Sequence, residues 1–89
     1  MGHFHSTIRG EGKNRAEAQR TAIDDFLHEN GRRHSVREVS HGTKIDVVPP
    51  RGVIRKEGQY EIHDFTTRNP DAPKDQWVEI WEFELHTHA

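Results

Sequence analysis

A capped amphipathic segment is the feature that most constrains the fold of this chain. Asn14 is a suitable N-cap, and Glu17 follows three residues later, as in a capping box. Asn30-Gly31 is a typical helix stop, with Gly31 suited to a left-handed position. The apolar residues between these ends recur at helical spacing: Ala18, Ala22, Ile23, Phe26 and Leu27. The sequence therefore predicts one helix over about residues 14–30.

Alternating segments surround this helix and predict strands. In "HFHSTIR" (residues 3–9), Phe4 and Ile8 point to one side, while the histidines and Thr7 point to the other. Residues 34–50 predict one long bent strand, or two short ones turning at His41-Gly42, and residues 53–65 predict a hairpin around Glu57-Gly58. Residues 66–76 predict a loop, and residues 77–88 the last strand.

The order of these segments predicts the fold class. One helix followed by a run of strands is typical of an α+β protein, with the single helix packed on one face of a mostly antiparallel sheet in the order β-α-β-β-β. The length favours a single domain over residues 1–89. In the last strand, Trp81 and Phe83 share a face, whereas Val78 and Ile80 have the opposite parity. A bulge, or a segment buried on both faces, would explain this switch.

The apolar content predicts self-association. Hydrophobic residues make up 30% of the chain and aromatic residues 8%. A globular domain usually reaches about 45–50% on a count that includes glycine. Either the core is thin or another subunit covers part of the sheet, and we favour a homo-oligomer because small domains often need one for stability.

Several classes of protein are disfavoured by composition. A formal net charge of −2 argues against general nucleic-acid binding but allows a local basic patch. The lack of cysteine excludes disulfides, thiolate zinc sites and cysteine nucleophiles. No apolar run reaches the length of a membrane span, and no leader pattern opens the chain, so a cytoplasmic protein without membrane contact is expected.

The start of the helix is the best candidate for binding. Basic side chains gather there, and the acidic ones lie in the later half of the helix, which is the reverse of what the helix dipole favours. Free N–H groups at a helix start bind phosphate, and glycines allow close approach. An anion site is therefore predicted, with a solvated helix end as the alternative. Its residues are Arg9, Gly10, Gly12, Lys13, Arg15 and Arg20.

This stretch resembles the strand–helix end of double-stranded RNA-binding domains. Gly10-Glu11-Gly12, Lys13, Arg15, Ala18 and Ala22 occupy comparable places within residues 8–27. The resemblance implies contact with RNA phosphates. In that family the piece closes the domain and usually has a basic residue where Glu17 stands, whereas here it opens the chain.

A second resemblance covers more of the chain. A strand, a Gly-rich turn, an Ala-rich helix, "VREVSHG" and a closing aromatic strand are similar to dodecins, small β-α-β-β proteins that assemble into shells of twelve and bind flavin. The resemblance implies the fold and oligomerisation. Flavin binding is not expected, because the residues after the helix, Arg32 to Ser35, include no tryptophan, while Trp77 and Trp81 lie in the last strand.

Two pairs of histidines mark the ends of the chain. His3 and His5 begin it, His86 and His88 close it, and both pairs have i, i+2 spacing on predicted strands. If the first and last strands pair antiparallel, all four imidazoles meet on one outer face near Glu84. Imidazole and carboxylate suit zinc, nickel or copper. The alternatives are four solvated histidines or a face that responds to pH.

These patterns favour a non-enzymatic protein. No serine stands in a G-x-S-x-G elbow, and the neighbours His63 and Asp64 face opposite sides of a strand. The leading prediction is an oligomeric protein that binds an anion, above all the phosphate of RNA or DNA, without a cofactor. The first alternative is a dodecin-like assembly or storage protein that holds a small aromatic ligand or a metal through Trp77 and Trp81 or the terminal histidines. The second is a protein-binding adaptor or inhibitor.

Overall fold

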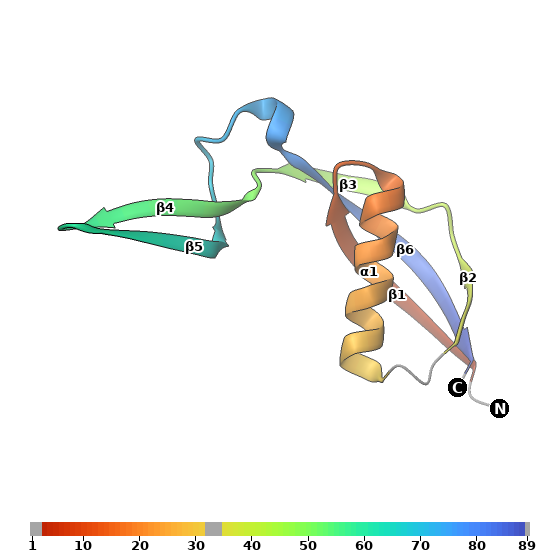
Figure 1. Ribbon diagram of the computed structural model, residues 1–89. Helices are drawn as coiled ribbons and strands as arrows, with labels where there is room; N and C mark the ends of the chain where they lie inside the picture. The colour runs from red at the N-terminus through yellow and green to blue at the C-terminus, as the bar shows by residue number, and fades with distance from the viewer. Residues whose placement is uncertain (1–2, 32–34, 89) are drawn as a thin grey trace.

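The part of the chain that the structure describes has one α-helix and two antiparallel sheets (Figure 1). The computed structural model describes the backbone of residues 3–31 and 35–88, and the side chains of residues 6–31 and 39–86. The predicted α+β class is confirmed, and residues 34–50 supply two strands rather than one. The elements run in the order β1 (His3–Gly12), α1 (Arg15–Asn30), β2 (Ser35–Val39), β3 (Thr43–Val48), β4 (Arg51–Glu57), β5 (Tyr60–Arg68), the 3-10 helix η1 (Lys74–Gln76) and β6 (Val78–His88).

Strand β6 is the centre of the larger sheet. It pairs antiparallel with β1 along one edge and with β2 and β3, one after the other, along the opposite edge. Its register with β1 runs without a shift, whereas β2 and β3 each carry an irregularity opposite it. Val78, Ile80 and Trp81 are all half-buried. The parity switch therefore reflects a strand covered on both faces, with the bulges in its partners.

Helix α1 packs on this sheet through its small residues. Ala18 and Ala22 are fully buried against Phe83, and Ile8, Val39 and Trp81 pack around them. The remaining apolar residues of the predicted stripe, Ile23, Phe26 and Leu27, are half-buried. Gly10 lies beneath the helix, where a Cβ atom would meet the Ala18 carbonyl oxygen and approach the Ala22 amide nitrogen to 2.7 Å. The close approach of α1 to β1 thus requires glycine at this position.

Strands β4 and β5 form a separate two-stranded sheet, here called the arm (residues 51–68), which projects from the helix-covered sheet (Figure 1). The predicted hairpin turn is confirmed, because Glu57 pairs with Tyr60 and Gly58 has a φ of 62°. Arg68 anchors the base of the arm: it donates to Glu11 and to the Pro49 carbonyl oxygen, both at 2.8 Å. The projection gives the molecule a long dimension of 58 Å, against 25 and 14 Å.

The contact between Gly10 and the helix can be tested by adding one methyl group. Gly10→Ala should lower the free energy of unfolding by about 1–3 kcal/mol, because overpacking forces neighbouring atoms to shift. Urea denaturation followed by helical circular dichroism measures this change. Thr7→Ala, on an exposed position of the same strand, should stay within about 0.5 kcal/mol of the parent. Equal stabilities for the parent and the Gly10→Ala protein would contradict the packing.

Candidate functional site

The two glycines predicted for the anion site lie under the helix. Both are buried, and a Cβ atom on Gly12 would approach the Ala18 amide nitrogen to 2.7 Å and the Glu17 Cβ to 2.8 Å. The space beside Gly10 and Gly12 is filled by α1 itself. Their observed role is therefore helix–strand packing.

The helix start is capped by side chains of the chain. Asn14 Oδ1 accepts a hydrogen bond from the Glu17 amide at 2.9 Å, and Glu17 Oε1 accepts one from the Lys13 amide at 3.4 Å. The predicted Asn14 cap is confirmed, whereas Glu17 reaches the amide of Lys13 rather than the Asn14 amide of a standard capping box. Glu17 also places a carboxylate beside the N–H groups that the prediction reserved for an anion, so the exposed basic side chains are better candidates for holding one.

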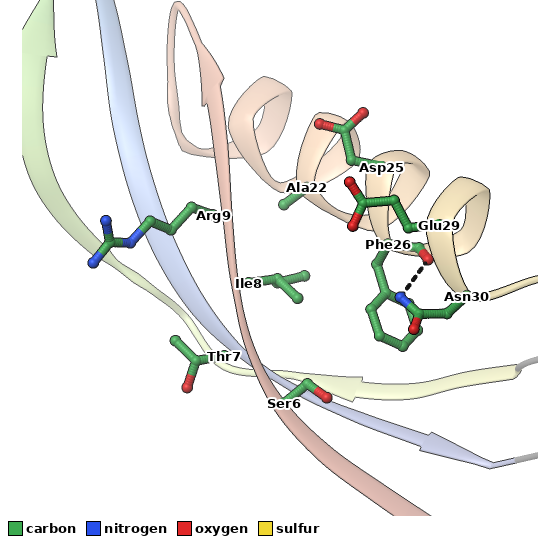
Figure 2. A pocket seen from close by; sticks show the side chains of 9 residues that line it. All are labelled: Ser6, Thr7, Ile8, Arg9, Ala22, Asp25, Phe26, Glu29 and Asn30. Carbon is green, nitrogen blue, oxygen red and sulfur yellow. Dashed lines mark hydrogen bonds between the residues drawn. The ribbon is translucent and has the colours of Figure 1, made fainter.

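The four basic side chains of the predicted site separate into two pairs. Arg9 extends away from the helix (Figure 2) and donates to Glu82 Oε2 at 3.0 Å, while Lys13 Nζ donates to the Asp75 carbonyl oxygen at 2.8 Å. Arg15 and Arg20 are exposed and line one shallow hollow on α1 with Ala16, Gln19 and Ile23. Within residues 6–31 and 39–86, neither of these two arginines takes part in an ion pair.

The backbone brings the histidine pairs together. His3 lies opposite His88 and His5 opposite His86, which confirms the antiparallel pairing on which the metal prediction depends. Directly opposite residues in an antiparallel pair share a face of the sheet. On the other edge of β6, Glu38 of β2 lies opposite His86. The side chain of His86 is exposed, and those of His3, His5 and His88 lie outside the described residues. Among the described side chains, no group of three could hold a metal ion.

Both tryptophans have partners within the chain. Trp77 Nε1 donates to the Ala72 carbonyl oxygen at 2.9 Å, and Lys74 Nζ lies 3.5 Å from the centre of the ring. Trp81 Nε1 donates to Glu79 Oε1 at 2.7 Å, and its ring stacks on Phe83 with centroids 6.3 Å apart. A planar ligand would have to share these rings with their present neighbours.

Two carboxylates have lowered pKa values, and hydrogen bonds are the main cause. The indole N–H of Trp81 lowers the pKa of Glu79, with a further contribution from the charge of Lys44. Asp64 accepts from the Thr67 and Thr66 hydroxyls at 2.7 and 2.8 Å and from their amides, which holds its pKa well below the usual range. Both groups are therefore anions that brace local structure.

A pocket of about 410 Å³ lies between β1 and the second half of α1 (Figure 2). Ile8 and Ala22 form its inner part, and Asp25 and Glu29 stand at its helical side. Sequence reasoning missed this pocket. A signal for it exists, because Ser6 takes an inward position of β1 between Phe4 and Ile8, and a small residue there leaves space beside the helix. Its two carboxylates disfavour an anionic ligand.

Comparison of the chain with protein-family models, curated proteins and solved structures finds no match. The resemblances to dodecins and to double-stranded RNA-binding domains therefore stay predictions. Among the described residues, no helix has both the length and the apolar character to cross a bilayer.

The bonds to Asp64 predict an unusual titration. Because its folded-state pKa is lowered, their stabilising effect is present above the ordinary aspartate pKa of about 3.9 and is lost only as pH falls through the lower folded value. A ¹³C NMR titration should place the Asp64 carboxyl midpoint below that of ordinary aspartates. Replacing Thr66 and Thr67 with Val should return it toward them. An ordinary midpoint in the parent protein would contradict the hydrogen bonding.

Proposed function

We propose that this chain is a small, non-enzymatic binding protein that works as a homo-oligomer and holds nucleic-acid phosphate on the outer face of α1. The observation that carries the proposal is the pair Arg15 and Arg20, which line one exposed hollow with Gln19. A guanidinium group presents donors in a fork that matches phosphate oxygens, and the Gln19 amide adds two more donors. Phosphate contacts of this kind supply affinity without reading base sequence.

The arrangement of the serines supports a role without catalysis. Ser40 Oγ accepts a hydrogen bond from the Glu84 amide at 2.9 Å, so this hydroxyl joins the β2–β3 connection to β6. Ser6 lies in the pocket of Figure 2, whose lining, as far as the structure describes it, includes no histidine to serve as its base. Nucleophilic catalysis by serine needs an adjacent base within hydrogen-bond reach.

The anion site can be tested with a double substitution. Arg15→Ala combined with Arg20→Ala should weaken binding to a nucleic-acid duplex and reduce the salt dependence of log K by about two units, one for each lost phosphate contact. Fluorescence anisotropy across a salt series measures both quantities. Arg55→Ala with Lys74→Ala removes the same charge from exposed positions outside α1 and should leave the slope unchanged. Equal slopes for the parent and the Arg15/Arg20 variant would overturn the site.

A second candidate function is binding of a divalent metal at the paired ends of β1 and β6. The register His3–His88 and His5–His86, with Glu38 opposite His86, favours it, because it gathers residue types that zinc, nickel and copper prefer in three neighbouring strands. A strand register fixes which residues are neighbours, so this candidate depends on the sheet rather than on the helix.

Thermal melts with and without zinc test the metal candidate. Zinc at a hundredfold excess over its dissociation constant should add roughly 2.7 kcal/mol of stability at pH 7.5. The gain should fade below about pH 6, because ligation requires neutral imidazole. His86→Gln with His88→Gln should remove the shift, whereas His28→Gln, on the exposed last turn of α1, should retain it. The absence of a shift at pH 7.5 would reject the metal candidate.

A further inference from the structure

The large apolar side chains that remain exposed are confined to one part of the described chain. Their exposed fractions range from 42% to 77%, and all five lie between β3 and β5. The helix and the core strands β1 and β6 contribute none of them. These residues are Ile45 (42%), Val47 (47%), Ile54 (62%), Tyr60 (77%) and Phe65 (74%). The exposed apolar surface is therefore a property of the arm and of the strand that leads into it.

The arm carries apolar side chains on both of its faces. Ile54 lies opposite His63, whose ring centroid is 6.0 Å from that of Phe65, so these three share one face. Tyr60 takes the opposite face with Val53 and Ile62, as strand alternation requires. A two-stranded hairpin is at best marginally stable in water without a further layer. Strands β4 and β5 pair only with each other among the described residues, so the arm lacks such a layer.

The charge balance of the arm favours a protein over a nucleic acid as its binding partner. Beyond the anchored base, residues 53–66 carry Arg55 and Lys56 against Glu57, Glu61 and Asp64, so acidic residues outnumber basic ones by one. A phosphate backbone would gain little from this balance. Lys56 lies directly opposite Glu61, so the face that they share presents both charges side by side. Such a surface suits a protein partner that also carries both charges, as β3 does with Lys44 and Asp46.

The surface that could receive the arm is present on the same chain. Strand β3 borders β6 on one side, and its outer edge has no strand partner among the described residues. The side chains of Ile45 and Val47, both in β3, are exposed. The seven residues of β4 span about 23 Å and the six of β3 about 20 Å, so the arm is long enough to cover this edge. An exposed strand edge is a ready template for another strand.

We propose that the arm docks on the edge strand β3 of a second copy of this chain, in a reciprocal dimer. The contact is isologous, since each copy provides one arm and receives one, and a two-fold axis satisfies both at once. It packs the Ile54–Phe65 face of the arm on Ile45 and Val47 of β3 in the partner subunit. This interface rests on the homo-oligomer part of the proposed function and gives that oligomer its contact residues.

Light scattering of the purified full-length chain is the first test. The parent protein should have twice the 10.4-kDa mass of the chain and dissociate on dilution. Ile54→Thr with Phe65→Thr places a residue with high strand propensity at both positions and should give 10.4 kDa at every concentration. Gln59→Ser, in the turn of the arm, should retain the dimer. The helical circular dichroism signal shows whether each variant is folded, because the core around α1 contains no residue of the arm.

Single cysteines then locate the contact, because the natural chain has none. Val47→Cys protein mixed with Ile54→Cys protein should form a mixed disulfide under mild oxidation. Gln19→Cys, on the outer face of α1, should form none with Ile54→Cys. A monomeric parent would overturn both this interface and the proposed oligomer. An oligomer that survives the Ile54/Phe65 substitution, or a mixed disulfide as abundant with Gln19→Cys, would overturn the interface alone.

Discussion

The fold depends on how closely α1 approaches β1 over Gly10. Because no side chain separates the helix from the strand, Ala18 and Ala22 can lie directly on the sheet and meet Phe83 of β6. This closeness keeps the core thin, since small residues fill the interface and bury little apolar area. Strand β6 compensates by pairing along both edges, with β1 on one side and with β2 and β3 on the other. Few residues of this chain can therefore be shielded from water by the chain alone.

Local patterns predicted the elements of this fold well. The Asn14 cap and Gly31 gave a helix over about residues 14–30, and the structure has it at Arg15–Asn30. The hairpin turn at Gly58 was also predicted, because turn chemistry is carried by neighbouring residues. The pairing of β1 with β6 entered only as a condition of the metal prediction, and the structure meets that condition. Sequence could not predict that the arm stands apart, since its position depends on Arg68 reaching Glu11, which lies 57 residues earlier in the chain.

For the candidate site, too, the sequence predicted local features but not contacts between distant parts of the chain. The sequence predicted a site of six residues at the helix start, but two of them bind partners far along the chain. Arg9 donates to Glu82, and Lys13 donates to the Asp75 carbonyl oxygen. Only Arg15 and Arg20 are left together on the outer face of α1. The predicted element bounds could have shown that these two arginines do not share a site with Arg9, because they lie in the helix and Arg9 lies in a strand. The low apolar content, in contrast, predicted self-association without indicating a surface, and the structure shows large exposed apolar side chains on β3 and the arm.

If the arm docks on β3 of a second copy, its stability should depend on protein concentration. Hydrogen exchange measured at several protein concentrations tests this directly, because amides in β4 and β5 exchange through local opening. We expect the protection of these amides to fall as the protein is diluted, while the ladder between β1 and β6 keeps more of its protection. Arm protection that is independent of concentration would contradict it, since the hairpin would then be held by its own chain.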